Sequence, residues 1–341
     1  PIPQDEFAAL VEEIKPAVVQ DPYITTFELT TALAFLYFSR QNITAAVIEV
    51  GLGGRLDATN IVTPLVSVIT SLSLEHTAVL GNTLTLIARE KAGIVKPGHP
   101  IVASPQVPEA VSVLDLVAEE HDVPLTLVGR DIFYEVKKKT IDGQMLEVWV
   151  KYGPKMKLSI PLLGDHQVEN AVTAYAALLV ARQEGLIFNA AQLKQGFADA
   201  EWPGRFEIWQ EKPPIVLDSA HNPDSFTKLD KTLEDYFPEK PVVMIFGISE
   251  DKNVAEMIAA LAGRLEKVIL TKSVHPRAVG AEDLLTFAEQ VGVKGEAVEP
   301  VEAAVARALE IVDEKNILLL SAGSIFVTAA VRAVLSKKKI K

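Results

Sequence analysis

The sequence predicts an α/β protein of two domains, and three observations support this prediction. Stretches with the apolar spacing of strands alternate with stretches of helical spacing through both halves of the chain, which is typical of parallel sheets with crossover helices. The chain has 341 residues, which is long for one compact domain and comfortable for two. Trp202-Pro203-Gly204 interrupts the alternation, because proline and glycine break regular elements. We therefore expect a hinge within Ala198–Arg205, and domains at residues 1–201 and 202–341.

The first domain is expected to combine helices with short, buried strands. Four segments have helical spacing: Asp5–Val19, Phe27–Arg40, Thr83–Ala92 and Pro108–His121. Three apolar runs have the length of buried strands: Ala45–Gly51, Leu65–Thr70 and Ile101–Ala103. This order of helices and strands indicates parallel pairing through helical crossovers.

The end of the first domain has a different pattern. Asp131–Val136, Met145–Val150 and Lys157–Ile160 alternate as antiparallel strands do, and Asp142-Gly143 is a turn signal between the first two. We predict a small β insertion on the edge of the first domain. A long helix at His166–Glu184 then ends the region.

The second domain repeats the α/β alternation. Its expected strands are Ile215–Leu217, Val242–Phe246, Lys267–Leu270 and Ile317–Leu320. Its expected helices are Ser225–Tyr236, Val254–Arg264, Ala281–Gln290, Val301–Val312 and Ser324–Leu335. No internal repeat interrupts this order, so the second half is interpreted as one further α/β unit.

The composition is that of an ordinary globular protein and excludes several functions. No apolar run reaches the ~20 residues that a membrane span requires, so we expect no membrane partner. The net charge of −12 argues against nucleic-acid binding, which needs a concentrated basic face. The one basic run, Lys337–Lys341, is interpreted as a solvated tail. The chain has no cysteine, which removes disulfides and thiolate metal sites and fits a reducing, cytoplasmic location.

Candidate ligand-binding residues follow two of the expected strands. Glu49 and the glycines of Glu49–Asp57 lie at the end of the first, where open α/β sheets bind ligands; a tight turn beside a solvated acid would give the same pattern. His76 follows the second strand. A carboxylate and an imidazole suit a divalent cation such as magnesium, although a lone histidine is more often a surface or core residue.

A third candidate, Lys91, lies in the last turn of the helix expected at Thr83–Ala92, just before Gly93. Glycine is common where a helix stops. A lysine at this position also interacts favourably with the helix dipole. The pattern alone therefore does not separate a structural lysine from a functional one.

Six motifs follow one another along the chain. They are EVGLGGRLDATN at Glu49–Asn60, LGNTLTLIAREKAGI at Leu80–Ile94 after His76, LLGDHQVENAVTAYAA at Leu162–Ala177, WPGRFE at Trp202–Glu207, LDSAHNPDS at Leu217–Ser225 and SAGSIF at Ser321–Phe326. In this order they resemble the folylpolyglutamate synthase and dihydrofolate synthase family of Mur-type ATP-dependent amide ligases. The resemblance implies a Mur-ligase-type ATPase domain with a small β insertion, followed by a C-terminal Rossmann-like domain. Family members are commonly monomeric, so a monomer is expected.

The resemblance also implies metal ligands. Glu49 and His76 match positions that hold a magnesium ion bridging the phosphates of ATP. Lys91 matches a lysine that carbon dioxide carbamylates. Carbamylation turns the ammonium into a carboxylate that can bind a second magnesium ion, and burial favours the neutral amine that this reaction requires.

The second group of implied residues binds ATP. Asn170 and Asp218 match positions near adenosine, Arg205 matches one near the phosphates, and His221 is a further candidate phosphate contact. Closure of the second domain about the hinge would bring Arg205 onto the transferring phosphoryl group. Structural alternatives are a surface role for Asn170 and a capping role for Asp218 at a helix that starts near Asn222.

The third group would hold the pterin part of the substrate. It consists of Thr25, Phe27, Arg55, Leu56 and Asp57. Phe27 would offer a stacking face and Asp57 an acceptor for a ring amine. Thr25 is equally suited to be a helix N-cap.

Three departures from the family pattern stand out. Ser219 replaces a usual glycine and Asn253 a usual aspartate, both small changes. In addition, neither a G-x-x-x-x-G-K-[ST] phosphate loop nor the family's G-T-N-G-K-G-S version occurs in the sequence. In the family this loop precedes the stretch that begins here at Pro1, so the chain is interpreted as N-terminally truncated and inactive by itself.

The implied reaction forms an acyl phosphate from ATP and a folate or dihydropteroate carboxylate, which the amine of L-glutamate then attacks. Catalysis would depend on positioning and charge neutralisation by two magnesium ions, Arg205 and closing domains. Two alternatives remain open: a muramyl amino-acid ligase that uses a UDP-linked acceptor, and a non-catalytic remnant that binds nucleotide or pterin.

Overall fold

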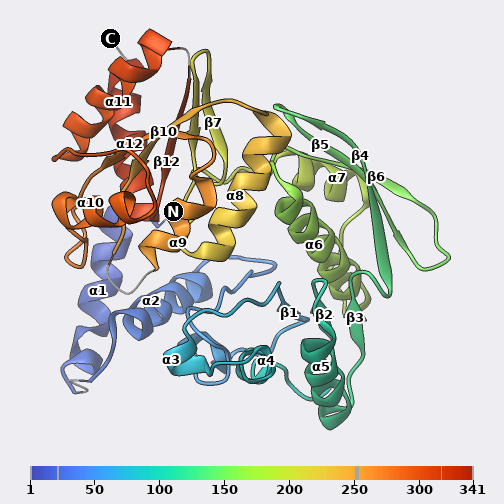
Figure 1. Cartoon of the computed structure of the whole chain (residues 1–341). Helices are drawn as coiled ribbons and strands as arrows, with labels where there is room; N and C mark the ends of the chain where they lie inside the picture. Colours follow the sequence, from blue (N-terminus) through green and yellow to red (C-terminus); the bar gives the residue numbers. More distant parts are fainter. Residues whose placement is uncertain (1, 21–22, 250–252, 316, 340–341) are drawn as a thin grey trace. The chain divides into compact units, whose positions relative to one another are not determined.

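The computed structural model describes residues 2–20, 23–249, 253–315 and 317–339, and the chain forms two compact units. Unit 1 comprises Pro1–Phe133 and Val172–Phe188, and unit 2 comprises Tyr134–Ala171 and Asn189–Lys341. Figure 1 shows the elements of both, coloured along the sequence.

Unit 1 contains a parallel three-stranded sheet. Its strands, in spatial order, are β1 (Ser67–Ile69), β2 (Ile101–Ala103) and β3 (Leu125–Leu127). Its helices are α1 (Gln4–Val18), α2 (Thr26–Arg40), α3 (Thr77–Leu80), α4 (Leu84–Ala92), α5 (Pro108–His121), a 3-10 turn η1 (Ala58–Ile61) and the C-terminal part of α6 (Asp165–Gln183). Apolar side chains from the sheet, α4 and α5 form one core.

The strand expected at Ala45–Gly51 does not form. Residues 45–50 have no regular structure, and Val47 is 98% exposed. A strand needs a neighbour to take up its backbone hydrogen bonds, and no described strand pairs with this stretch. Its apolar composition was therefore insufficient to predict its structure.

Unit 2 is built around a six-stranded sheet with the order β11-β10-β9-β12-β8-β7. The strands are β7 (Glu207–Glu211), β8 (Pro214–Leu217), β9 (Val242–Phe246), β10 (Leu265–Leu270), β11 (Gly295–Ala297) and β12 (Leu318–Ala322). All neighbours are parallel except β7, which runs antiparallel to β8 at the edge. The parallel core confirms the predicted Rossmann-like unit.

Helices cover both faces of this sheet (Figure 1). One core joins it to α8 (Pro223–Tyr236), α9 (Val254–Leu261) and α10 (Ala281–Gln290). The other joins it to α11 (Val301–Lys315) and α12 (Ile325–Lys339). Because both faces are covered, β9 and β12 are buried along their whole length, as expected for a parallel sheet between two helical layers.

The predicted β insertion is present and consists of β4 (Ile132–Thr140), β5 (Gly143–Val150) and β6 (Met156–Ile160), in that spatial order. Nearly all of it belongs to unit 2, whereas the sequence placed it on the first domain. Lys139 Nζ forms ion pairs with Asp165 at 2.6 Å and with Asp235 at 2.7 Å. These contacts connect the insertion to the start of α6 and to α8.

The predicted boundary at residue 201 lies between α7 (Ala190–Ala198) and β7, inside unit 2. A boundary between the two units falls within α6, after Ala171. Six of the described elements had no counterpart in the sequence prediction: η1, α3, β3, α7, β7 and β11. Within the described residues, no helix is both long and apolar enough to span a bilayer. Of the basic run 337–341, only the side chain of Lys337 is described.

Candidate active site

In unit 1, a loop at Gly51–Asp57 carries the predicted pterin-binding residues Arg55, Leu56 and Asp57. One oxygen of the Asp57 carboxylate accepts the backbone N–H groups of Gly51 at 2.9 Å and Leu52 at 3.0 Å. The other accepts the N–H of Thr59 at 2.9 Å. Asp57 therefore closes the loop on itself.

These hydrogen bonds also set the charge of Asp57. Partial burial pushes its pKa upward, but hydrogen bonds from Thr59, Leu52 and Gly51 outweigh burial and hold the pKa below its usual value. The carboxylate is thus ionised at neutral pH. It is available to a ring amine only through lone pairs that the loop leaves unused.

The same loop packs closely against the C-terminal end of α4. A Cβ at Gly54 would lie 2.7 Å from the carbonyl oxygen of Lys91, and a Cβ at Gly93 would lie 2.4 Å from Cβ of Arg55. The Arg55 guanidinium forms an ion pair with Glu90 at 3.1 Å. Glycine at these two positions is therefore required by close backbone approach, and the contacts place Arg55 beside the turn that carries Lys91.

Two further elements meet the loop. A Cβ at Gly51 would lie 2.4 Å from the ring of Phe27, and one at Gly53 would lie 3.0 Å from Leu80 of α3. Phe27 is 42% exposed, so part of its ring remains accessible. The structure thus brings α2, α3 and α4, each with at least one predicted site residue in or beside it, to a single loop.

Thr25 takes the structural role that the sequence left open. It is the N-cap of α2, where its hydroxyl accepts the N–H of Glu28 and the Glu28 carboxylate accepts the N–H of Thr25 at 2.8 Å. This reciprocal pair is a capping box. Leu56 is 81% exposed and packs into no core.

The predicted metal ligands differ in how their backbone is held. Glu49 is exposed on the unpaired stretch, Lys91 is half-buried in the last turn of α4, and His76 is exposed at the start of α3. His76 has φ of 52°, the left-handed region that non-glycine residues seldom adopt, and such strain clusters at functional sites. No hydrogen bond or ion pair between described residues links these three side chains. The described residues also contain no group of three or more His, Asp or Glu side chains that could hold a metal ion.

In unit 2, Arg205 lies in a turn with unusual backbone geometry. Its neighbours Gly204 and Phe206 have φ of 75° and 46°. Phe206 is 3% exposed and its ring packs near Tyr236 and Phe237. A bulky residue at positive φ is strained, so its buried ring and the bonds around it must hold the turn. Arg205 itself is exposed and forms no hydrogen bond through its side chain with another described residue.

Asp218, at the carboxyl end of β8, supplies one of these bonds. Its carboxylate accepts the N–H of Phe206 at 2.8 Å and that of Ala220 at 2.7 Å. Burial raises the pKa of Asp218, while these N–H groups and the charge of Arg205 oppose the rise. Asp218 does not cap α8, whose N-cap is Asn222.

The other predicted nucleotide contacts lie on the same unit. His221 Nδ1 is 3.1 Å from the carbonyl oxygen of Ser219, and the backbone N–H of His221 donates to the Ser225 hydroxyl at 3.0 Å. Asn170 is exposed on α6 and donates to Gln167 at 3.3 Å. His221 is half-buried.

One residue that the sequence did not single out, His166, lies half-buried near Arg205. Burial, with the charges of Lys228 and Arg205, lowers the pKa of His166 to about 4. Its imidazole is therefore neutral at physiological pH. His166 lies inside the LLGDHQVENAVTAYAA motif, but a histidine in a helix gives no sign of its burial.

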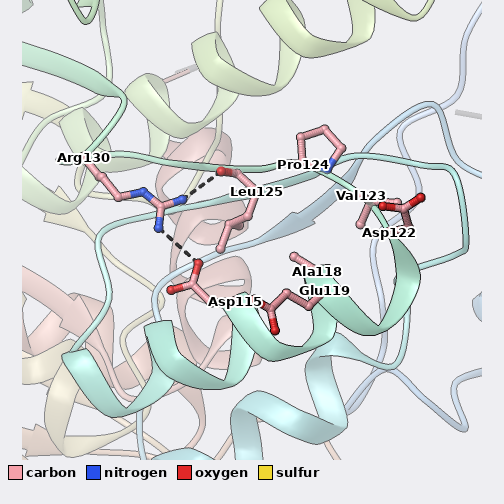
Figure 2. Close-up of a pocket in the computed structure, with 8 residues that line it drawn as sticks. All are labelled: Asp115, Ala118, Glu119, Asp122, Val123, Pro124, Leu125 and Arg130. Atoms are coloured by element: carbon pink, nitrogen blue, oxygen red, sulfur yellow. Dashed lines mark hydrogen bonds and ion pairs between the residues drawn. The ribbon is translucent and has the colours of Figure 1, made fainter.

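A hollow on unit 1 contains none of the predicted site residues. It is lined by Asp115, Ala118, Glu119, Asp122, Val123, Pro124, Leu125 and Arg130. Figure 2 shows the Arg130 guanidinium bonded to Asp115 and to the carbonyl oxygen of Leu125. The charge of Arg130 is thus already paired within the protein, so we assign the hollow no function.

Comparison with known proteins agrees with the fold. Residues 7–178 match the Mur ligase middle domain, and residues 204–325 match the Mur ligase glutamate ligase domain. The fold and these matches define the chain as a Mur ligase.

The relatives narrow the class. The chain is 34% identical over 339 residues to the dihydrofolate synthase/folylpolyglutamate synthase of Bacillus subtilis, covering 97% of this chain and 78% of that protein. It is similar to Mycobacterium tuberculosis folylpolyglutamate synthase complexed with ADP, with a TM-score of 0.88, 30% identity and coverage of 98% and 79%. It is also similar to E. coli FolC in complex with DHPP and ADP, with a TM-score of 0.86, 31% identity and coverage of 99% and 77%. The chain belongs to the folylpolyglutamate synthase/dihydrofolate synthase family, whose members are ATP-dependent ligases.

Proposed function

We propose that the reaction this chain serves is the ATP-dependent joining of L-glutamate to folate, with dihydropteroate as a second acceptor. Family membership supports the reaction class. The main support for particular residues is the position of Arg205. It lies in a strained turn at the carboxyl edge of the mostly parallel sheet. Ligands commonly bind at this edge in open α/β sheets.

In the proposed reaction, a carboxylate oxygen of the pterin substrate attacks the γ-phosphorus of ATP, and ADP leaves. The amine of glutamate then attacks the acyl carbon, and phosphate leaves as the amide forms and the amine loses a proton. Arg205 is suited to stabilise charge on the transferred phosphoryl group. Asn170, Asp218 and His221 are proposed to line the nucleotide site, with Asp218 acting through the backbone that it holds.

In unit 1, we propose that Phe27, Arg55, Leu56 and Asp57 hold the pterin. Their support is the shared loop: Phe27 packs on Gly51, and Arg55 lies against the end of α4. The half-exposed ring of Phe27 offers a stacking surface. Thr25 would contribute by fixing the start of the helix that carries Phe27.

Magnesium would be held by Glu49, His76 and a carbamylated Lys91. The donor set fits, because magnesium binds through one or two carboxylates together with substrate phosphates and water rather than through a full protein cage. When bound, it neutralises phosphate charge. Glu49 is exposed and Lys91 half-buried, so neither residue is enclosed in a core.

Ligand binding tests the substrate class. We expect titration calorimetry to detect binding of ADP and of dihydropteroate or folate to the 341-residue chain. A UDP-muramyl acceptor should not bind. Binding of the muramyl acceptor without any binding of pterin would reject the folate assignment in favour of the muramyl alternative.

Turnover by these 341 residues alone is proposed to be negligible, because the sequence contains no G-x-x-x-x-G-K-[ST] loop whose N–H groups and lysine would hold the phosphates. Phosphate release with ATP, magnesium, glutamate and pterin substrate measures this. A rate comparable to that of a family member with such a loop would contradict it.

A further inference from the structure

The turn that carries Arg205 is held by two carboxylates, and the nucleotide assignment involves only one of them. Asp218 accepts the N–H of Phe206, on one side of Arg205. Glu207 accepts the N–H of Gly204, on the other side, at 2.9 Å. The two positive-φ residues that flank Arg205 are therefore each fixed through their own backbone amide.

Glu207 is in turn held by a residue far away in the sequence. Arg332 of α12 donates through Nε to both Glu207 carboxylate oxygens, at 3.1 and 3.0 Å. The guanidinium also lies over the ring of Trp209, 5.3 Å from its centroid. Trp209 occupies an irregularity in the register between β7 and β8, and such bulges redirect side chains.

Arg332 has a rigid base, because its helix is anchored in the core through Val327, Val331 and Leu335. A chain of contacts thus runs from the buried face of α12 through Arg332 and Glu207 to the Gly204 amide. Ser219 lies close to Gly204 on the other side of the turn: a Cβ at Gly204 would lie 3.0 Å from the Ser219 Oγ.

We propose that Glu207 and Arg332 are positioning residues that aim the Arg205 guanidinium at the phosphates of ATP. The inference rests on the proposed function, in which Arg205 binds those phosphates. Phe206 is strained at positive φ, whereas Gly204 adopts positive φ freely, so its direction depends on the bond to Glu207. Without the ion pair to Arg332, the Glu207 side chain that holds the Gly204 amide loses its own anchor. The arginine would then sample several directions, and its phosphate contact would weaken while the adenosine contacts remain.

The test compares the dissociation constants of ATP and adenosine by calorimetry on the 341-residue chain. Their ratio isolates the contribution of the phosphates. Arg205→Gln should reduce the preference for ATP about tenfold or more, since charge-assisted contacts are lost. Glu207→Gln should reduce it by about three- to tenfold through misplacement of the same arginine. In the Arg205→Gln background, Glu207→Gln should change the ratio by less than about twofold.

The chain offers a matched control. Arg307 of α11 donates through Nε to both oxygens of Glu296 on β11, at 2.9 and 3.2 Å, another pair between helix and strand in unit 2. Glu296→Gln should leave the ratio unchanged even if it lowers the melting temperature. If Glu207→Gln does not fold, Arg332→Gln breaks the same pair from the other side and should reduce the ratio in the same direction.

The outcomes separate this inference from the proposed function. A ratio unaffected by Arg205→Gln, or a parent chain without any preference for ATP, would overturn the proposed role of Arg205 itself. A ratio reduced by Arg205→Gln and unaffected by Glu207→Gln would overturn the positioning role alone. An equal loss from Glu207→Gln with and without Arg205 would also overturn it, because Glu207 would then act by another route.

Discussion

Two aspartates, Asp57 in unit 1 and Asp218 in unit 2, hold the backbone of the two candidate functional loops, and they do so in opposite environments. Asp57 is partly exposed, and its hydrogen bonds lower its pKa. Asp218 is buried, and burial raises its pKa. The stretch before the Asp57 loop has no strand partner, whereas Asp218 ends a strand inside a six-stranded sheet.

The difference shows how far each predicted site is fixed by the protein. In unit 2 a buried carboxylate at the end of a six-stranded sheet holds the backbone of the turn that carries Arg205. In unit 1 the loop is fixed against α4, but Glu49 lies on the unpaired stretch. A catalytic group must be held close to its working geometry, and of the two candidate loops the one that carries Arg205 is the more firmly held.

The largest effect is expected for Asp218→Ala. It leaves the N–H groups of Phe206 and Ala220 without their acceptor in a buried site, so the free energy of unfolding should fall by about 3–4 kcal/mol. Asp57→Ala, in the exposed loop, should cost about 1 kcal/mol. Urea unfolding of both variants measures the difference, and equal losses would remove the contrast between the two loops.

Burial in unit 2 should also give the protein a specific acid sensitivity through His166. Its pKa is about 4 in the folded protein and 6.5 ordinarily. Between these values the unfolded chain binds a proton that the folded chain does not, so stability falls as the pH drops from 6.5 toward 4, by at most about 3 kcal/mol. His166→Gln should flatten this part of the stability profile. An unchanged slope between pH 6.5 and 4 would show that another group is responsible.

The contact between the unit 1 loop and α4 can be tested by Gly54→Ala. Its Cβ would come within 2.7 and 2.9 Å of the carbonyl oxygens of Lys91 and Glu90, so we expect a loss of about 2 kcal/mol. Gly263 has no atom near an added Cβ and serves as the control. Thermal unfolding measures both variants, and an equal fall in melting temperature for Gly54→Ala and Gly263→Ala would show that the loop is not packed as described.

The smallest effect is expected at Val47. It is 98% exposed, so Val47→Ala should change the free energy of unfolding by less than about 0.5 kcal/mol. The same substitution at Val243, fully buried in β9, should cost about 2 kcal/mol. A loss at Val47 as large as that at Val243 would mean that this stretch is buried in solution.

Sequence patterns predicted β9 and failed at Ala45–Gly51, although both are short apolar runs. The first is flanked by strands on both sides in the sheet, and the second has none among the described residues. A pattern within one segment carries no information on whether a partner strand exists. The short elements β3, β7 and β11 escaped prediction for a related reason, since pairing defines them more than their own residues do.

Candidate site residues could be named from the sequence where they stand in a motif, whereas contacts that depend on distant packing stayed hidden. Arg205 and Asp218 were named from their motifs, and Glu207 stood in the same motif without a role. Arg332 lies 125 residues from Glu207, and no spacing in the sequence connects them. The burial of His166 is likewise a property of the folded chain.

Amide hydrogen exchange tests the contrast between the two regions most directly. The account predicts strong protection for Val243–Phe246 of β9 and for Phe206, whose N–H is bound to Asp218. It predicts rapid exchange for residues 46–50, which have no strand partner. Protection of 46–50 equal to that of β9 would contradict the conclusion that the candidate residues of unit 1 and those of unit 2 differ in how firmly the chain holds them.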